Sequence, residues 1–139
     1  MNPPSPCYCV TVRRAAQAVT QLYDNALEPS GLKITQLSLL RAIARHGPVS
    51  ITELAVAVYL DRTTLGRNLR VLEREGLVAL TPGTDQRERV VHLTEQGEAA
   101  LVTAAPLWEE AQAKVRNTLG KEQLETLTAL LAQVAAVAP

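Results

Sequence analysis

The 139-residue sequence is poor in aromatic residues: it has three tyrosines, one tryptophan and no phenylalanine. Proteins that bind single-stranded nucleic acid need aromatic side chains on which bases stack, so this class of function is disfavoured. No run approaches the ~18 consecutive apolar residues of a membrane-spanning helix. The N-terminus also lacks the apolar core of a signal peptide. These absences predict a soluble, cytoplasmic protein without a membrane partner.

An excess of charge of one sign and a full set of metal ligands are also missing. Lys+Arg and Asp+Glu are 14 each, which excludes a polybasic tail. The two cysteines, Cys7 and Cys9, have no second pair with which to complete a structural zinc site. No phosphate-binding glycine loop and no nucleophile elbow occurs. We therefore expect no metal, no cofactor and no enzymatic activity.

Hydrophobic spacing predicts a mainly α protein with one small β-hairpin. Apolar residues at steps of three and four, bounded by capping residues and by Gly or Pro, indicate helices. Ser50 and Glu53 have the spacing of a capping box, and Asp61 and Thr94 are further candidate caps. The predicted helices are 12–27, 35–46, 50–58, 61–75, 94–117 and 121–137. Two β-branched runs, 77–81 and 89–93, flank a polar loop and predict the hairpin.

The order of elements in 50–93 is that of a helix-turn-helix followed by a wing. On a helical projection of 61–75, leucines occupy one side, and the opposite side carries Thr63, Arg67, Arg70 and Arg74 without a carboxylate. A solvated surface helix explains why the exposed side of 61–75 is polar, but it does not explain why its charges are all positive. Residues 33–92 hold nine basic and six acidic residues, so the neutral total conceals a basic centre.

This pattern predicts binding to double-stranded DNA, because Arg pairs with guanine edges and clamps phosphates, and Thr reaches either. Asp85, in the hairpin loop, is expected to orient a nearby arginine. The alternative is a winged-helix protein-interaction module, for which duplex binding that depends on salt would be absent. The candidate DNA contacts are Thr35, Gln36, Ser50, Arg62, Thr63, Thr64, Arg67, Asn68, Arg70, Arg74, Arg87 and Arg89.

Three segments resemble the multiple-antibiotic-resistance regulator (MarR) family: Leu72–Val78, Asp85–Arg87 and Leu93–Gly97. The family's wing pattern is Asp-x-Arg, five residues, Leu-Thr, and Gly three residues after the Thr, and the chain matches each position. The resemblance covers about residues 10–137. It implies a homodimeric winged-helix repressor or activator, with the recognition role on helix 61–75 and a minor-groove role for Arg87. Gly66, inside that helix, departs from good helix-forming sequence.

The outer helices carry more aliphatic surface than a winged-helix core of roughly sixty residues can cover. They could fold back as a monomeric cap. We favour a homodimer on a palindromic operator, because one recognition helix reads only a half-site, and half-sites lie about 34–36 Å apart. The expected organisation is one chain, 1–139, with dimerisation helices at 8–30 and 98–139 and a winged helix-turn-helix at 33–95.

Two signals could release such a regulator from DNA. The resemblance implies a small, anionic aromatic effector bound between the dimer arms and the winged region, with Tyr23, Leu40, His46 and Trp108 as candidate lining residues. The competing signal is oxidation of Cys7 and Cys9. The sequence leaves both open.

Overall fold

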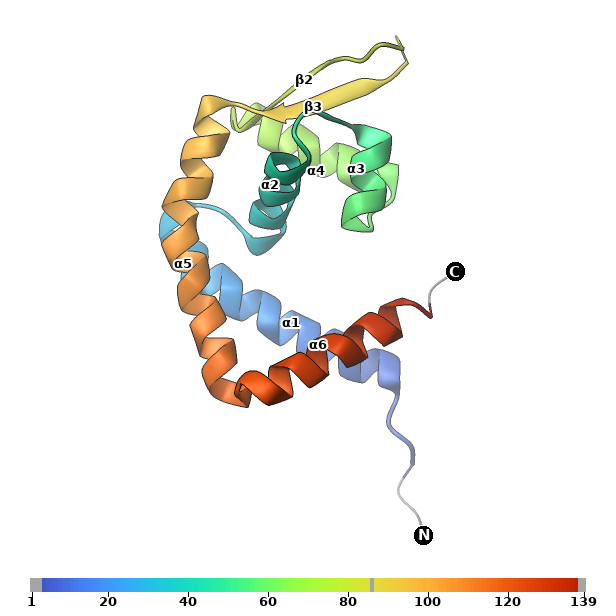
Figure 1. Ribbon diagram of the computed structural model, residues 1–139, viewed down its shortest axis with the longest axis vertical. Helices are drawn as coiled ribbons and strands as arrows, with labels where there is room; N and C mark the ends of the chain where they lie inside the picture. Colours follow the sequence, from blue (N-terminus) through green and yellow to red (C-terminus); the bar gives the residue numbers. More distant parts are fainter. Residues whose placement is uncertain (1–3, 86, 138–139) are drawn as a thin grey trace.

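The computed structural model describes residues 4–85 and 87–137, and it places a winged-helix region beside two helical arms (Figure 1). The elements follow in the order α1 (Tyr8–Leu27), the 3-10 turn η1 (Glu28–Ser30), α2 (Ile34–His46), β1 (Val49–Ser50), α3 (Ile51–Val58), α4 (Arg62–Arg74), β2 (Val78–Pro82), β3 (Arg89–Leu93), α5 (Glu95–Leu119) and α6 (Lys121–Ala135). The predicted fold class, mainly α with a β-hairpin wing, is confirmed.

The sheet is antiparallel with strand order β1-β3-β2. The predicted hairpin pairs Val78 with Leu93 at its base and Pro82 with Arg89 near its tip. The strand β1 was not predicted from the sequence, and it joins β3 by pairing Val49 with Val91. Two residues are too few to show the alternation that marks a strand.

Local capping starts three helices at the predicted residues. The Ser50 Oγ accepts the Glu53 N–H at 3.1 Å, an Asp61 carboxylate oxygen accepts the Thr64 N–H at 2.8 Å, and the Thr94 Oγ1 accepts the Gly97 N–H at 3.0 Å. Each bond satisfies an N–H that has no partner within the helix. The predicted starts of α3, α4 and α5 are therefore confirmed.

The helix α2 begins one residue earlier than the predicted range 35–46. It starts at Ile34, and the Ile34 N–H is bonded to Asp24 Oδ1 of α1 at 2.8 Å. The Lys33 N–H is bonded to Gln36 Oε1 at 2.9 Å. The cap comes from another helix, so α1 also fixes where the winged region begins.

The core lies between α2, α3, α4 and the sheet. Its fully buried side chains are mostly leucines, which bury large apolar area while keeping few rotamers. The largest of those below 2% exposure are Leu27, Leu37, Leu40, Ile43, Leu54, Leu65, Leu69, Leu72 and Val91. Because three of them belong to α4, the burial of one face of this helix fixes which face it presents to solvent.

A tight junction joins the wing to α5. The Thr94 hydroxyl donates to the Gly76 carbonyl at 2.6 Å, and the Thr94 N–H donates to the Leu77 carbonyl at 3.2 Å. A Cβ added at Gly97 would lie 2.1 Å from that Leu77 oxygen. Only a glycine permits this approach of α5 to the turn that follows α4.

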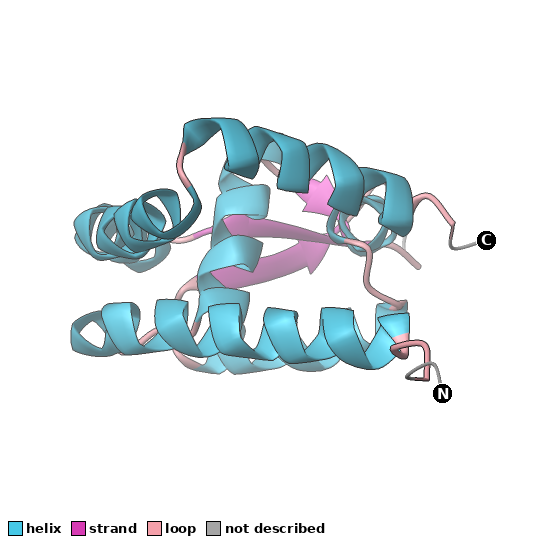
Figure 2. Ribbon diagram, turned by 90° about the horizontal axis from the view of Figure 1, so that it is seen from below, coloured by secondary structure: helices cyan, strands magenta, loops and turns pink. Residues whose placement is uncertain are grey.

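The arms consist of α1 and the C-terminal part of the chain. The helix α5 packs on α1 and α2 and carries α6 at its far end (Figure 1). Seen from below, α1 and α6 form two separate rods that extend in the same general direction (Figure 2). The helix α6 contains no buried residue. None of the described helices combines the length and apolar character that crossing a membrane requires.

Candidate nucleic-acid interface

The helix α4 presents a face of cations and one hydroxyl to solvent. Thr63, Arg67, Arg70 and Arg74 are all exposed, as is Arg62 at the N-terminus of the helix. The first four lie opposite the three buried leucines of α4, and Arg62 flanks the first turn. Long guanidinium side chains on a helix held rigidly by its core are suited to base edges and phosphates.

The first turn of α4 is organised by Asp61. One carboxylate oxygen accepts the Thr64 N–H, and the other accepts the Thr64 hydroxyl at 2.9 Å. The main-chain bond, followed by the hydroxyl bond, holds the pKa of Asp61 below its ordinary value. The negative charge is therefore directed at its own helix end, and the Thr64 hydroxyl, one of the predicted contacts, is already engaged in the cap.

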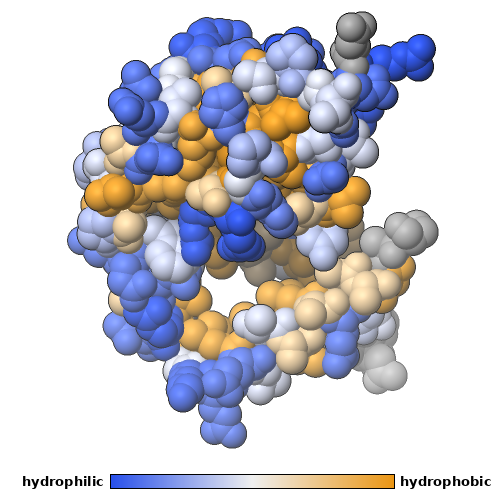
Figure 3. All heavy atoms as spheres, turned by 45° about the horizontal axis from the view of Figure 1, so that its top comes forward, coloured by the Kyte–Doolittle hydropathy of each residue, from blue (hydrophilic) through white to orange (hydrophobic). Residues whose placement is uncertain are grey.

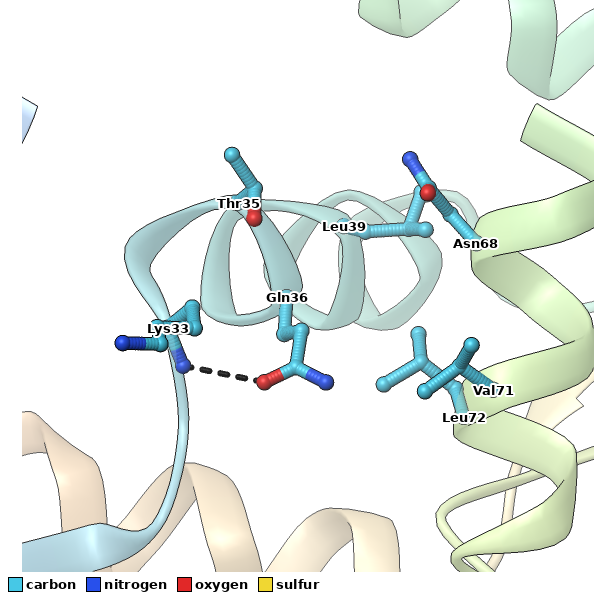
Figure 4. A pocket seen from close by; sticks show the side chains of 7 residues that line it. All are labelled: Lys33, Thr35, Gln36, Leu39, Asn68, Val71 and Leu72. Carbon is cyan, nitrogen blue, oxygen red and sulfur yellow. Dashed lines mark hydrogen bonds between the residues drawn. The ribbon is translucent and has the colours of Figure 1, made fainter. Parts of the chain in front are cut away.

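Three further candidates, Thr35, Gln36 and Asn68, are brought together across a hollow of about 210 Å³ between α2 and α4 (Figure 4). Asn68 is exposed and lies on the flank of α4 that faces α2, beside the arginine face and not within it. Gln36 is held by its bond to the Lys33 N–H, drawn as a dashed line in Figure 4. Thr35 and Gln36 thus form a second polar group at the N-terminus of α2, which faces Asn68 of α4 across the hollow.

The predicted DNA contact of Ser50 conflicts with its position. Ser50 is 7% exposed, and its Oγ accepts the Glu53 N–H. A hydroxyl that caps a helix from within the fold does not reach a ligand outside it. The structure therefore gives Ser50 a capping role in place of a DNA contact.

The wing carries Arg87 and Arg89 on its exposed side. Asp85 Oδ1 accepts the main-chain N–H of Arg87 at 3.1 Å, and the Glu88 N–H donates to the Asp85 carbonyl at 2.9 Å. Asp85 was predicted to orient a nearby arginine. In the structure its carboxylate bonds the main chain of Arg87, not the guanidinium, and so shapes the turn that carries Arg87. Gln86, between them, lies outside the described residues.

Comparison with known proteins agrees with this geometry. Residues 30–88 match the model of the MarR family. The Mycobacterium tuberculosis transcriptional regulator MosR, solved in complex with DNA, is 43% identical with a TM-score of 0.84, covering 95% of this chain and 98% of that chain. YwoH, an uncharacterized HTH-type transcriptional regulator of Bacillus subtilis, is 30% identical, and the match covers 63% of this chain and 64% of that protein. The homoprotocatechuate degradative operon repressor of Escherichia coli is 27% identical, over 92% of this chain and 87% of that protein. The chain belongs to the MarR family.

As a MarR-family protein, the chain is a DNA-binding transcriptional regulator and not an enzyme. This sets aside the alternative of a winged helix that binds only protein. The family match spans η1 to the wing and so contains α4 and every predicted DNA contact except Arg89.

A larger hollow of about 490 Å³ opens between α2 and α5 of this MarR-family chain. The Arg41 guanidinium lies 4.2 Å from the centroid of the Trp108 ring. The hollow is lined by Leu37, Arg41, Ala44, Arg45, Leu101, Ala105 and Trp108. The two arginines were not predicted, although their i, i+4 spacing places them on one face of a helix.

Of the four predicted effector residues, only Trp108 lines this hollow. Leu40 is completely buried in the core, and His46 is exposed at the end of α2. Tyr23 donates its hydroxyl to Gln112 Oε1 of α5, and burial raises the pKa of this phenol. Tyr23 therefore contributes to the contact between α1 and α5.

The cysteines are free and exposed at the start of α1. Cys7 precedes the helix with an extended backbone, φ −78° and ψ 110°, whereas Cys9 lies inside its first turn. Side chains two residues apart on a helix point in different directions, so a bond between these thiols requires the first turn to change shape. Within the described residues, no group of three or more His, Cys, Asp or Glu side chains could hold a metal ion.

Proposed function

We propose that this protein is a homodimeric repressor that places α4 in the major groove of each half of a palindromic operator. The observation that carries the proposal is the outward face of α4, where Arg67, Arg70 and Arg74 meet no carboxylate. Arg62 and Thr63 extend this face to the helix N-terminus, the end from which recognition helices reach base edges.

The wing and the start of α2 extend the proposed interface along the DNA backbone. Arg87 and Arg89 enter or approach the minor groove, where narrow A·T-rich segments attract arginine. Thr35, Gln36 and Asn68 face phosphates on the flank of α4. Contacts of this kind position the protein without reading sequence.

Pairing of two chains through the arms is supported by apolar side chains left in solvent. Figure 3 shows hydrophobic atoms on the arms and around the opening between the arms and the winged region. On α6, the half-exposed residues Leu127, Leu130, Leu131 and Val134 share one helix face. Val12 and Val19 of α1 are also exposed. A second copy, related by two-fold symmetry, would cover these faces and supply the second α4.

Repression is favoured over activation for two reasons. A dimer that occupies both half-sites blocks access to the same stretch of promoter. The E. coli relative described above is an operon repressor.

The main test is binding to the duplex upstream of its own gene at fixed salt. Arg67→Ala should weaken binding by about 1–3 kcal/mol, or roughly 5- to 150-fold, if the arginine pairs with guanine. Lys121→Ala, an exposed cation at the start of α6, is the matched control and should bind as the wild type does. Unchanged affinity after separate replacement of Arg62, Arg67 and Arg70 would contradict the placement of α4.

For the releasing signal we propose two candidates, each with its own observation. An aromatic carboxylate fits the hollow between α2 and α5, where Arg41 and Arg45 supply charge and Trp108 supplies a ring face. Hydrogen peroxide could instead oxidise Cys7 and Cys9, converting two thiols to a disulfide with release of two waters. Either must favour a conformation of the dimer that binds DNA less tightly.

One comparison separates the two signals. The operator affinity of the wild type and of a Cys7→Ser, Cys9→Ser double variant is measured with and without peroxide. A loss confined to the wild type assigns the signal to the thiols. Equal responses assign it elsewhere, and Arg41→Ala then tests whether aromatic carboxylates act through the hollow.

A further inference from the structure

The turn between α3 and α4 contains an unusual residue. Tyr59 has φ 57° and ψ 38°, and among the described residues it is the one non-glycine with positive φ. Four other helix ends reach the same region of φ with a glycine: Gly31, Gly47, Gly76 and Gly120. A side chain in the left-handed region carries a conformational cost that glycine does not.

The hydrogen bonds of the turn show why positive φ is required there. The Leu60 N–H donates to the Ala55 carbonyl at 3.1 Å, and the Tyr59 N–H donates to the Val56 carbonyl at 3.4 Å. This is the paired arrangement of a Schellman helix end, which needs a left-handed residue where Tyr59 stands. The turn thus explains the backbone of residue 59, but it gives no reason for a tyrosine.

Packing within the chain gives no reason either, since the Tyr59 side chain is 94% exposed. A large aromatic ring that is exposed to water at a strained backbone position contributes no stabilising contact to the folded chain. Residues held in sparsely populated backbone conformations tend to mark functional sites. The contact that favours a tyrosine here must therefore lie outside the chain.

The position of the turn indicates what that contact is. Tyr59 stands three residues before Arg62, so their Cα atoms are at most about 11 Å apart. Asp61, between them, has both carboxylate oxygens bonded to Thr64 and is turned toward its own helix. When the N-terminus of a recognition helix enters the major groove, the residues just before it lie beside the phosphates at the groove edge.

We propose that Tyr59 is a further operator contact, with its hydroxyl donating to a phosphate oxygen and its ring lying against the neighbouring deoxyribose. Tyrosine is one of the residues that bind the DNA backbone in this way. The proposal rests on the placement of α4 argued above. The contact is to the backbone and is made by a neutral side chain, so it adds affinity without reading sequence or displacing a counterion.

The informative variant is Tyr59→Gly, because it removes the side chain and relieves the backbone at once. Its melting temperature should rise by about 2–4 °C. Its affinity should fall about 5- to 10-fold for the operator and for an unrelated duplex alike. The slope of affinity against salt should not change, because no cation is removed. Tyr59→Phe should lose part of this affinity by removing the hydroxyl alone.

Val56→Ala is the matched control, since Val56 is 75% exposed one turn earlier on α3 and should not touch DNA. If Tyr59→Gly binds both duplexes as tightly as the wild type, the proposal is overturned. If Tyr59→Gly and Val56→Ala both keep wild-type DNA affinity but both lose transcriptional control, the proposal is overturned in favour of a protein-binding patch. If the wild type itself binds no duplex, the proposed function has failed, and that result is distinguishable from failure of the Tyr59 contact alone.

Discussion

Two glycines in this chain should respond in opposite directions to the same added methyl group. Gly66 lies within α4, and a Cβ built there meets nothing within 4 Å. Gly97 lies in the first turn of α5, where a Cβ would be 2.1 Å from the Leu77 carbonyl oxygen and 3.3 Å from Leu93 Cδ2. Replacement by alanine therefore tests the close contact between the wing and α5 at Gly97.

The size of each effect follows from its surroundings. Gly66→Ala should raise the free energy of unfolding by about 1 kcal/mol, the difference in helix propensity between the two residues. In Gly97→Ala a main-chain oxygen must move, and such overpacking costs about 1–3 kcal/mol. Displacement of Thr94 from the carbonyls of Gly76 and Leu77 adds about 0.5–1.5 kcal/mol for each bond lost.

Thermal and urea unfolding measure the stability of both variants. All samples are kept at one protein concentration, because the stability of the proposed dimer would depend on it. At about 2–4 °C per kcal/mol, Gly66→Ala should melt a few degrees above the wild type. Gly97→Ala should melt at least about 5 °C below it. A Gly97→Ala protein as stable as the wild type would falsify the junction described here. The operator affinity of Gly66→Ala adds a second result: a loss despite greater stability means that DNA approaches the backbone at Gly66.

Two other predictions concern the arms and the cap of α4. Leu130→Glu places a carboxylate on the apolar face of α6 and should convert the proposed dimer to a 15.0 kDa monomer by light scattering. Ala132→Glu adds the same charge at an exposed position on the opposite face of α6 and should leave that dimer intact. A Leu130→Glu dimer would contradict pairing through α6. Because the pKa of Asp61 is lowered in the folded chain, its stabilising effect is complete above the ordinary value of 3.8 and is lost as the pH falls through the folded pKa. Between neutral pH and pH values below 3.8, Asp61→Asn should therefore lose less thermal stability than the wild type loses. Equal losses in the two proteins would show that the cap does not depend on charge.

Sequence reasoning succeeded where an interaction spans three or four residues. The caps at Ser50, Asp61 and Thr94 are side chains bonded to N–H groups three residues ahead, so the sequence itself displays both partners. The arginine face of α4 is equally local, since helical spacing alone separates it from the buried leucines. These features are sufficient to place α4 and the wing.

Sequence reasoning failed where a partner comes from a distant element. Asp24 caps α2 from α1, and Arg41 lies over Trp108 of α5, and neither pairing has a local signature. Leu40 was predicted to line an effector pocket from the family resemblance, but its helix turns Leu40 into the core. Periodicity identifies the apolar face of a helix, but it does not identify the surface against which that face packs.

The same distant contacts connect the proposed signals to the proposed operator. If two chains pair through α1 and α6, the separation of their α4 helices depends on how α5 and α1 meet the winged region. Trp108 and Arg41 lie at one such contact, and Asp24, which caps α2, lies at another. The cysteines stand at the far end of the same α1. A ligand that separates α2 from α5, or an oxidation that reshapes α1, would change the spacing of the half-site readers without touching an arginine of α4. Because a palindromic operator would fix that spacing, a small change at either contact would weaken binding of the proposed dimer while each α4 keeps its own surface unchanged.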